Sequence, residues 1–210
     1  MQDKKVYLGR YILAFTIATI LFVLVFLISY SVSYLNYKTV SNENSLIINY
    51  TKDLENLLND KTCSDNLLVE SSEKMDAIVT RLGILETRFG KHDFRVLEQK
   101  KLFSELSYNH FQIVRRLIKE CDADITTLIF FYSNEKSYEK ESVRTGIILS
   151  TLKNVRKSRT MIYSYDFDLD SDLISKIKMQ YNITEAPIVV VNEKIVTKIS
   201  NIDELEKYLE

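Results

Sequence analysis

Residues 183–192 read ITEAPIVVVN and contain the only proline of the 210-residue chain. Proline has no backbone N–H to donate and is excluded from the interior of sheets. Here Pro187 stands directly before four β-branched residues, Ile188 to Val191, which form the most strand-like run of the sequence. The position of Pro187 therefore predicts a tight loop that leads into a short strand, and the elements around this loop decide the fold.

Upstream of this loop, the sequence predicts a strand, a helix and a second strand. The segments TLIFFYS (127–133) and TMIYSYDFD (160–168) are rich in β-branched and aromatic residues, and the polar stretch 138–153 between them is compatible with a helix. A strand–helix–strand order implies a right-handed crossover. We therefore expect the two strands to pair in parallel.

Beyond the second strand we expect a helix over 171–183, then the strand that follows Pro187. A further strand, KIVTKIS (194–200), comes after the short Asn192-Glu193 connection, which predicts an antiparallel hairpin. Asn201 with Glu204 three positions later resembles a capping box and predicts a last helix.

This order, β-α-β-α-β-β-α over 125–210 with the proline before the third strand, resembles the thioredoxin fold. The resemblance rests on LIFFYS (128–133), YNITEAPIVVVN (181–192) and NIDELEKYL (201–209). In that family the proline at this position has a cis peptide bond and faces the active site. The resemblance implies the same for Pro187, and an ordinary trans proline that starts a strand is the alternative.

The catalytic part of the resemblance is missing. Family members place a CxxC motif in the loop after the first strand, at the start of the first helix. Here that loop reads SNEKSYEKES (133–142) and holds no cysteine; depending on the register, the two positions fall on Lys136 and Glu139 or on Tyr138 and Glu141. Tryptophan, often found beside that motif, is absent from the chain. We therefore expect no catalytic residue and no cofactor.

The segment Tyr11 to Val32 carries no charged residue over 22 positions, which is enough for a helix to cross a hydrocarbon core of about 30 Å. A cleavable signal peptide is the alternative, because Ser31 and Ser33 form a small-x-small pair, although the apolar run exceeds the usual length of such peptides. Three cations precede the span, whereas Lys38 is the only cation in the 18 residues that follow it. This asymmetry predicts a cytoplasmic N-terminus and an extracytoplasmic remainder.

Helical periodicity without proline follows the span. A short amphipathic helix leaving the membrane is predicted from apolar residues at spacings of three and four. Two longer helices are predicted on either side of GKHD (90–93), where Gly90 suits a helix C-cap and Asp93 an N-cap, and they form an antiparallel, coiled-coil-like hairpin. The apolar positions are Leu46, Ile47, Tyr50, Leu54, Leu57 and Leu58, then Leu67, Leu68, Met75, Ile78, Val79, Leu82, Leu85 and Phe89.

The two cysteines lie at similar distances on either side of the predicted turn. Cys63 comes 28 residues before Lys91 and Cys121 comes 30 residues after it, so both reach the open end of the hairpin. We expect a structural disulfide, since an extracytoplasmic compartment permits oxidation. Free buried thiols and a redox-active pair are the alternatives; the second lacks the CxxC spacing that lowers a thiol pKa.

No metal site is expected. His92 falls at the predicted turn and His110 within a helix, without partners at metal-ligand spacing, so both are interpreted as surface or satisfied histidines. The alternating carboxylates of 166–172 lack the glycine and the final glutamate of a calcium loop, and we expect them to be a solvated strand end that leads into a helix.

These observations define four parts and two functions. The parts are a cytoplasmic N-terminus (1–10), a transmembrane helix (11–34), a helical hairpin region (42–122) and a thioredoxin-like domain (125–210). A net charge of −1 gives no indication of nucleic-acid binding, and the expected partners are the membrane and a protein or extended peptide. The favoured function is a redox-inactive scaffold that binds peptide at Ala186, Pro187, Lys136 and Tyr138. The alternative is a thiol–disulfide oxidoreductase that uses Cys63 and Cys121 or the cysteines of a partner.

Overall fold

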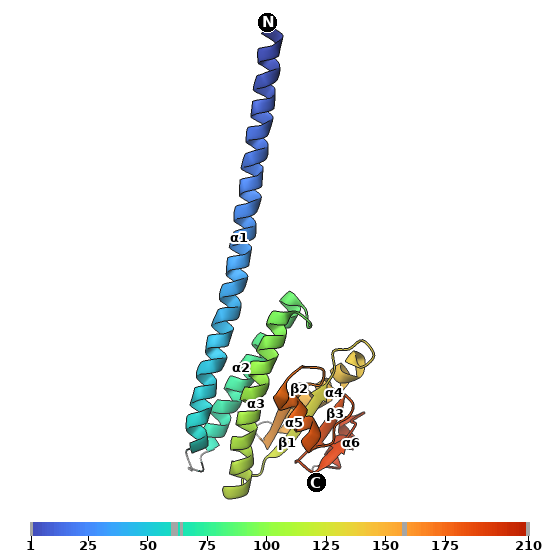
Figure 1. The fold of residues 1–210 in the computed structure, drawn as a ribbon. Coiled ribbons are helices and arrows are strands. Elements are labelled where there is room, and N and C mark those ends of the chain that lie inside the picture. The colour runs from blue at the N-terminus through green and yellow to red at the C-terminus, as the bar shows by residue number, and fades with distance from the viewer. Residues whose placement is uncertain (1, 60–62, 64, 157–158, 209–210) are drawn as a thin grey trace. The chain divides into compact units, whose positions relative to one another are not determined.

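The computed structural model describes residues 2–59, 63, 65–156 and 159–208. These residues fall into two compact units, Met1–Glu43 and Asn44–Glu210. Helix α1 (Gln2–Asn59) contains the whole of the first unit's described chain and continues into the second (Figure 1).

One stretch of α1, Gly9–Thr39, is long and apolar enough to span a membrane. Within it the hydroxyls of Thr16, Thr19, Ser31 and Thr39 each donate to the carbonyl four residues earlier, at 2.9 Å. Each of these bonds satisfies a polar side chain within the helix itself, which a helix that spans a membrane requires. The stretch is thus compatible with a membrane span in its side-chain hydrogen bonds as well as in its length.

The expected separate amphipathic helix after the span is not present as such, because α1 runs to Asn59 without a break. Between Arg10 and Leu82 the chain has neither glycine nor proline, so no residue in this stretch interrupts a helix. Several side chains on which that expectation depended lie outside the described residues, namely Leu46, Ile47, Leu54, Leu57 and Leu58, and the same is true of Leu67 and Leu68 of the next predicted helix.

The predicted hairpin is confirmed as α2 (Asp65–Phe89) and α3 (Phe94–Glu120). Gly90 takes a φ of 91°, which side-chain-bearing residues rarely adopt, and the Asp93 carboxylate accepts the Arg95 N–H at 3.0 Å as the N-cap of α3. Contacts between early α2 and late α3, and between late α2 and early α3, show that the two helices are antiparallel.

The C-terminal part forms one mixed sheet in the order β2-β1-β3-β4. Strand β1 (Thr126–Tyr132) pairs in parallel with β2 (Thr160–Asp166) and antiparallel with β3 (Ile188–Val191), which pairs with β4 (Ile195–Thr197). The helices of this part are α4 (Glu139–Arg156), α5 (Asp172–Gln180) and α6 (Ile202–Glu206). The predicted α/β element order and both pairings are confirmed, and this arrangement is compatible with a thioredoxin-like fold.

Helices cover both faces of the sheet, because successive β1 side chains point to opposite faces. Ile129 and Phe131 lie in a core that includes residues of α2, α3 and α5, whereas Leu128 and Phe130 pack with α4 and α6. The helical hairpin therefore shares one hydrophobic core with the sheet.

Local turn chemistry fixes the ends of the short elements. Three residues, 192–194, connect β3 to β4; Asn192 and Glu193 adopt φ values of 48° and 60°, and the Lys194 N–H donates to the Val191 carbonyl at 3.0 Å across the turn. Asn201 accepts the Glu204 N–H at 2.8 Å, and the Glu204 carboxylate accepts the Ser200 N–H at 2.9 Å. The predicted cap of α6 is thus confirmed, with the return bond going to the residue before the cap.

Candidate functional site

Three segments meet at the carboxyl end of β1, which we call the corner. The antiparallel register sets Ile188 opposite Phe131, so Pro187 lies beside the end of β1. The loop 133–138 continues from β1 into α4, and β2 ends at Asp166 opposite Tyr132. The corner therefore brings together the loop after β1, the loop before β3 and the end of β2.

The Ala186–Pro187 peptide bond is cis, and both side chains are buried. β3 begins only at Ile188, so the missing N–H of Pro187 removes no bond of the ladder. Among the described residues, the backbone N–H and C=O of Ala186 have no hydrogen-bond partner. These two main-chain groups are thus not committed to internal pairing, and the residue that carries them is 5% exposed.

The loop after β1 is closed by serine side chains. The Ser133 N–H donates to the Ser142 hydroxyl at 3.0 Å, and the Ser133 hydroxyl accepts the Glu135 N–H at 3.1 Å. Lys136 and Tyr138 follow with exposed side chains, Tyr138 at 47%. This loop positions two of the predicted binding residues at the surface.

The segment before Pro187 carries an ion pair between Glu185 and Lys198. Lys198 donates to the Glu185 carboxylate at 2.8 Å, and this hydrogen bond raises the pKa of Lys198. The charges of Glu141 and Tyr138 act on the same ammonium group and raise its pKa further. The strand register places Ala186 and Pro187 beside the end of β1, and Lys136 and Tyr138 lie in the loop that continues from that end into α4.

A buried ionic cluster lies beneath the corner. Lys100 of α3 contacts Asp166 at 2.7 Å and Glu86 of α2 at 2.9 Å; the Lys100 side chain is 2% exposed and that of Asp166 is 6%. Asn134 donates to the same Asp166 oxygen at 2.9 Å. Burial, with the Asp166 and Glu86 charges, raises the pKa of Tyr132 well above its usual value. The cluster joins both hairpin helices to the end of β2.

This cluster corrects the expectation of a solvated strand end for Asp166 alone, because Asp168, Asp170 and Asp172 are exposed as expected. Asp166 is buried, and Asp168 accepts the Ser133 hydroxyl at 2.5 Å. A buried carboxylate needs a cation or several hydrogen bonds, and here both are present. The missed signal was Lys100, which falls between Val96 and Phe103 on the apolar face of α3.

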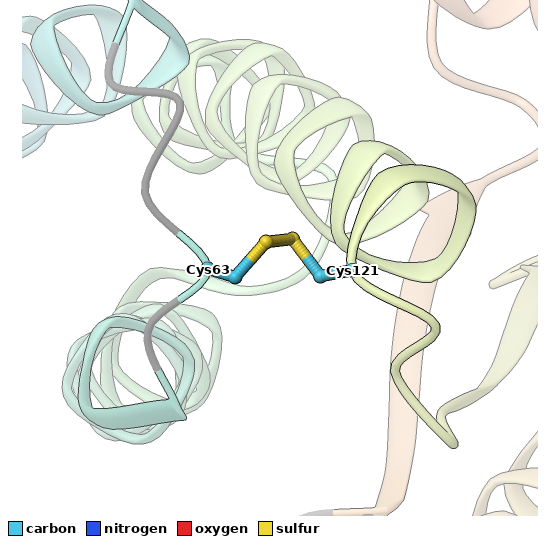
Figure 2. The surroundings of a disulfide bond; sticks show 2 residues. All are labelled: Cys63 and Cys121. Atoms are coloured by element: carbon cyan, nitrogen blue, oxygen red, sulfur yellow. A yellow bond between two sulfur atoms is a disulfide. The ribbon is translucent and has the colours of Figure 1, made fainter.

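The cysteines form the expected disulfide, with the Cα atoms 5.6 Å apart. Figure 2 shows Cys63, in the segment before α2, joined to Cys121 at the end of α3. Cys121 precedes the first residue of β1, whereas Pro187 lies beside its last, so the seven residues of β1, about 20 Å, separate the two ends. The structure does not bring the cysteines to the corner.

His110 is a satisfied buried histidine, as predicted. Its Nε2 lies 2.9 Å from the Ser71 hydroxyl and its Nδ1 2.9 Å from the Tyr163 hydroxyl. Burial, reinforced by Lys153 and opposed by Asp76, lowers the pKa of His110 to about 4. Among the described residues no group of three or more His, Cys, Asp or Glu side chains is arranged to hold a metal ion.

Comparison with known proteins gives no relative to which the chain can be assigned. No protein-family model matches the sequence, and no curated protein matches it significantly. The geometry of the corner is therefore the basis for any functional proposal.

Proposed function

We propose that this protein is a single-pass membrane protein whose thioredoxin-like domain binds an extended peptide or protein segment without redox chemistry. The observation that carries the proposal is the backbone of Ala186, whose N–H and C=O have no partner among the described residues. An extended peptide can pair with such groups by strand addition, in which main-chain hydrogen bonds supply affinity.

The absence of sulfur from the corner supports a binding role. The loop 133–142, all of it described, contains no cysteine, and the same holds for 183–198. Thiol–disulfide exchange requires an attacking thiolate within reach of the bound chain. The corner thus offers main-chain pairing and an exposed aromatic, Tyr138, but no nucleophilic sulfur.

The alternative, an oxidoreductase that uses Cys63 and Cys121, has weaker geometric support. Their disulfide lies toward the opposite end of β1 from Pro187, and a chain bound at Ala186 does not reach it locally. An enzyme using this pair would need a second docking surface near the open end of the hairpin. We therefore favour a structural role for the bond.

The proposed orientation has the N-terminus in the cytoplasm and Asn44–Glu210 outside. The span is preceded by three cations, Lys4, Lys5 and Arg10, whereas Lys38 is the only cation in the 18 residues after Val32. A disulfide is also more common in proteins that face an oxidising compartment. Both observations support the same side for the binding domain.

Peptide binding is tested with the full chain in nanodiscs and a library of extended peptides. Ala186→Pro removes the N–H of residue 186, and Ala186→Gly, which retains it, is the matched control. We expect binding by the native chain and A186G, and loss of at least about tenfold in affinity for A186P, as for one main-chain hydrogen bond left unmade.

A second measurement leaves the protein unchanged and so does not depend on the folding of A186P. N-methylation of the bound peptide, one position at a time, removes one main-chain donor from each peptide. Strand addition requires that methylation at alternate positions abolishes binding, because alternate N–H groups face the partner strand. Uniform tolerance of methylation contradicts the proposal, as does equal affinity of A186P and A186G.

A further inference from the structure

The loop after β1, which is part of the proposed peptide site, is tied to the end of β2 by two hydrogen bonds. The Asn134 side chain donates to Oδ2 of Asp166 at 2.9 Å, and the Ser133 hydroxyl donates to Oδ2 of Asp168 at 2.5 Å. Hydrogen bonds to an ionised acceptor are roughly twice as strong as those between neutral groups. The two carboxylates therefore determine where the first residues of the loop lie.

The backbone holds these two carboxylates in one arrangement. The Asp168 N–H donates to Oδ1 of Asp166 at 3.2 Å, and the Phe167 N–H donates to the Tyr132 carbonyl at 2.8 Å. Tyr132 is the last residue of β1, and Asp166 lies opposite it as the last residue of β2. A displacement of Asp166 would therefore move both acceptors of the loop together.

Lys100 of α3 contacts Asp166 from the side of the helical hairpin. Its Nζ lies 2.7 Å from Oδ2 of Asp166, the oxygen that also accepts from Asn134, and 2.9 Å from Glu86 of α2. The Lys100 and Asp166 side chains are buried, and removing one partner of a buried pair leaves an uncompensated charge. The position of Asp166 therefore depends on Lys100, and through Lys100 on the packing of α3.

We propose that Lys100 is a positioning residue of the peptide site, which holds Asp166 in place so that the end of β2 fixes the loop after β1. This role rests on the proposed function. Contacts run from α2 and α3 through Lys100 and Asp166 to Asn134, so a change in the packing of the hairpin alters the loop and, with it, the affinity for peptide. Lys100 itself is too buried to contact a peptide.

A second ion pair between the hairpin and the sheet domain provides a matched control. Lys153 of α4 contacts Asp76 of α2 at 2.5 Å. Lys153 lies in the last turn of α4, whereas the loop 133–138 precedes the first turn. Lys153→Met therefore removes a contact between hairpin and sheet domain at the end of α4 that is remote from the loop.

Three variants break the proposed link at different points. Asn134→Ala removes the donor on the loop, and Lys100→Met removes the cation on the hairpin. Asp166→Asn removes the charge between them while Lys100 keeps Glu86 as a partner, so it strands no buried carboxylate. Each full-length variant is placed in nanodiscs, and hydrogen exchange of the loop amides, peptide affinity and stability in urea are measured.

We expect the amides of 134–138 to exchange faster in N134A, D166N and K100M than in the native chain, and peptide affinity to fall at least about threefold. K153M should lose some stability and keep both the loop exchange and the affinity of the native chain. Combined with N134A, K100M should lower the affinity no further, because two changes in one chain of contacts are not additive.

Loop exchange in D166N and K100M that equals that of K153M overturns the proposal. An additive loss of affinity in the double variant also overturns it, since Lys100 then acts by another route. Where K100M does not fold, D166N with and without N134A takes its place in the same comparison. Absence of peptide binding by the native chain contradicts the proposed function instead, and the exchange measurement then decides by itself whether the hairpin positions the loop.

Discussion

Lys100 of α3 and Asp166 at the end of β2 form an ion pair, 2.7 Å between Nζ and Oδ2, in which both side chains are almost fully removed from solvent. The two residues are 66 positions apart in sequence and belong to the hairpin and to the sheet. The pair therefore joins parts of the fold that the sequence pattern presents as separate.

Loss of the Lys100 charge is expected to destabilise the fold strongly. Lys100→Met leaves the buried Asp166 and the partly exposed Glu86 without their shared cation, and breaking a buried pair such as Lys100–Asp166 costs about 3–5 kcal/mol. Urea unfolding of the detergent-solubilised chain measures the effect. The neighbouring Lys101→Met, whose partner Glu98 is exposed, is the control and should change the free energy of unfolding by less than about 1 kcal/mol.

A second change distinguishes a lost charge partner from lost packing. In Lys100→Met combined with Asp166→Asn, one of the two stranded carboxylates becomes neutral, so part of the lost stability should return. Equal instability of the single and double variants would show that the side chain of Lys100 acts through its packing and not through its charge.

The free energy of unfolding is expected to decrease as the pH is lowered from about 6.5 to about 4, because of His110. The pKa of this residue is lowered from 6.5 to about 4 in the folded chain, so in this range the unfolded chain binds a proton that the folded chain does not. The contribution of His110 to the free energy of unfolding is fully present above pH 6.5. It decreases by about 3 kcal/mol in total as the pH is lowered.

Urea midpoints measured between pH 4.5 and 7.5 test this slope. His110→Gln removes the titrating group and should flatten the pH dependence, although it also changes the bonds to Ser71 and Tyr163. His92→Gln, in the exposed turn, is the control for replacing a histidine without changing the bonds to Ser71 and Tyr163. The same slope in H110Q and the native chain would contradict the assignment.

The disulfide should contribute stability without affecting peptide binding. Cys63 and Cys121 are separated by 58 positions, and closing a loop of that length stabilises by up to about 4 kcal/mol on the chain-entropy model. Cys63→Ser with Cys121→Ser should lower the free energy of unfolding by up to this amount. Dithiothreitol should destabilise the native chain and leave the variant unchanged, and a stronger loss of peptide affinity than of stability would contradict a purely structural role.

The order of elements could be predicted from sequence because it depends on local signals. Strand-like runs, the caps at Gly90, Asp93 and Asn201, and the short Asn192-Glu193 connection each determine a few neighbouring residues. The uninterrupted α1 was missed because the change from apolar to amphipathic composition was interpreted as a break. Without glycine or proline, such a change alters what the helix faces and not whether it continues.

The corner could be predicted in part. The position of Pro187 before a strand indicated the loop, and the strand order brings it beside the end of β1. The ionic cluster could not be assigned, because which carboxylate meets Lys100 depends on how the hairpin packs against the sheet. The sequence shows that Lys100 lies on the apolar face of α3, but it does not show which carboxylate binds this lysine.

The native chain is expected to show no disulfide reductase activity. The loop 133–142 has no cysteine, and the Cys63–Cys121 bond lies toward the other end of β1, so a chain bound near Pro187 meets no thiolate. Reduction of insulin by the full-length protein, in the presence of a chemical reductant, should equal the rate of the reductant alone.

The double variant Cys63→Ser with Cys121→Ser is the control for this assay, because it removes both cysteines of the chain. Native and variant rates should coincide. Turnover that is present in the native chain and absent from the variant would assign an enzymatic role to the pair. It would also require a docking surface near the open end of the hairpin, about 20 Å along β1 from the one proposed here. Equal rates together with peptide binding at Ala186 would show that the domain holds a polypeptide without exchanging electrons with it.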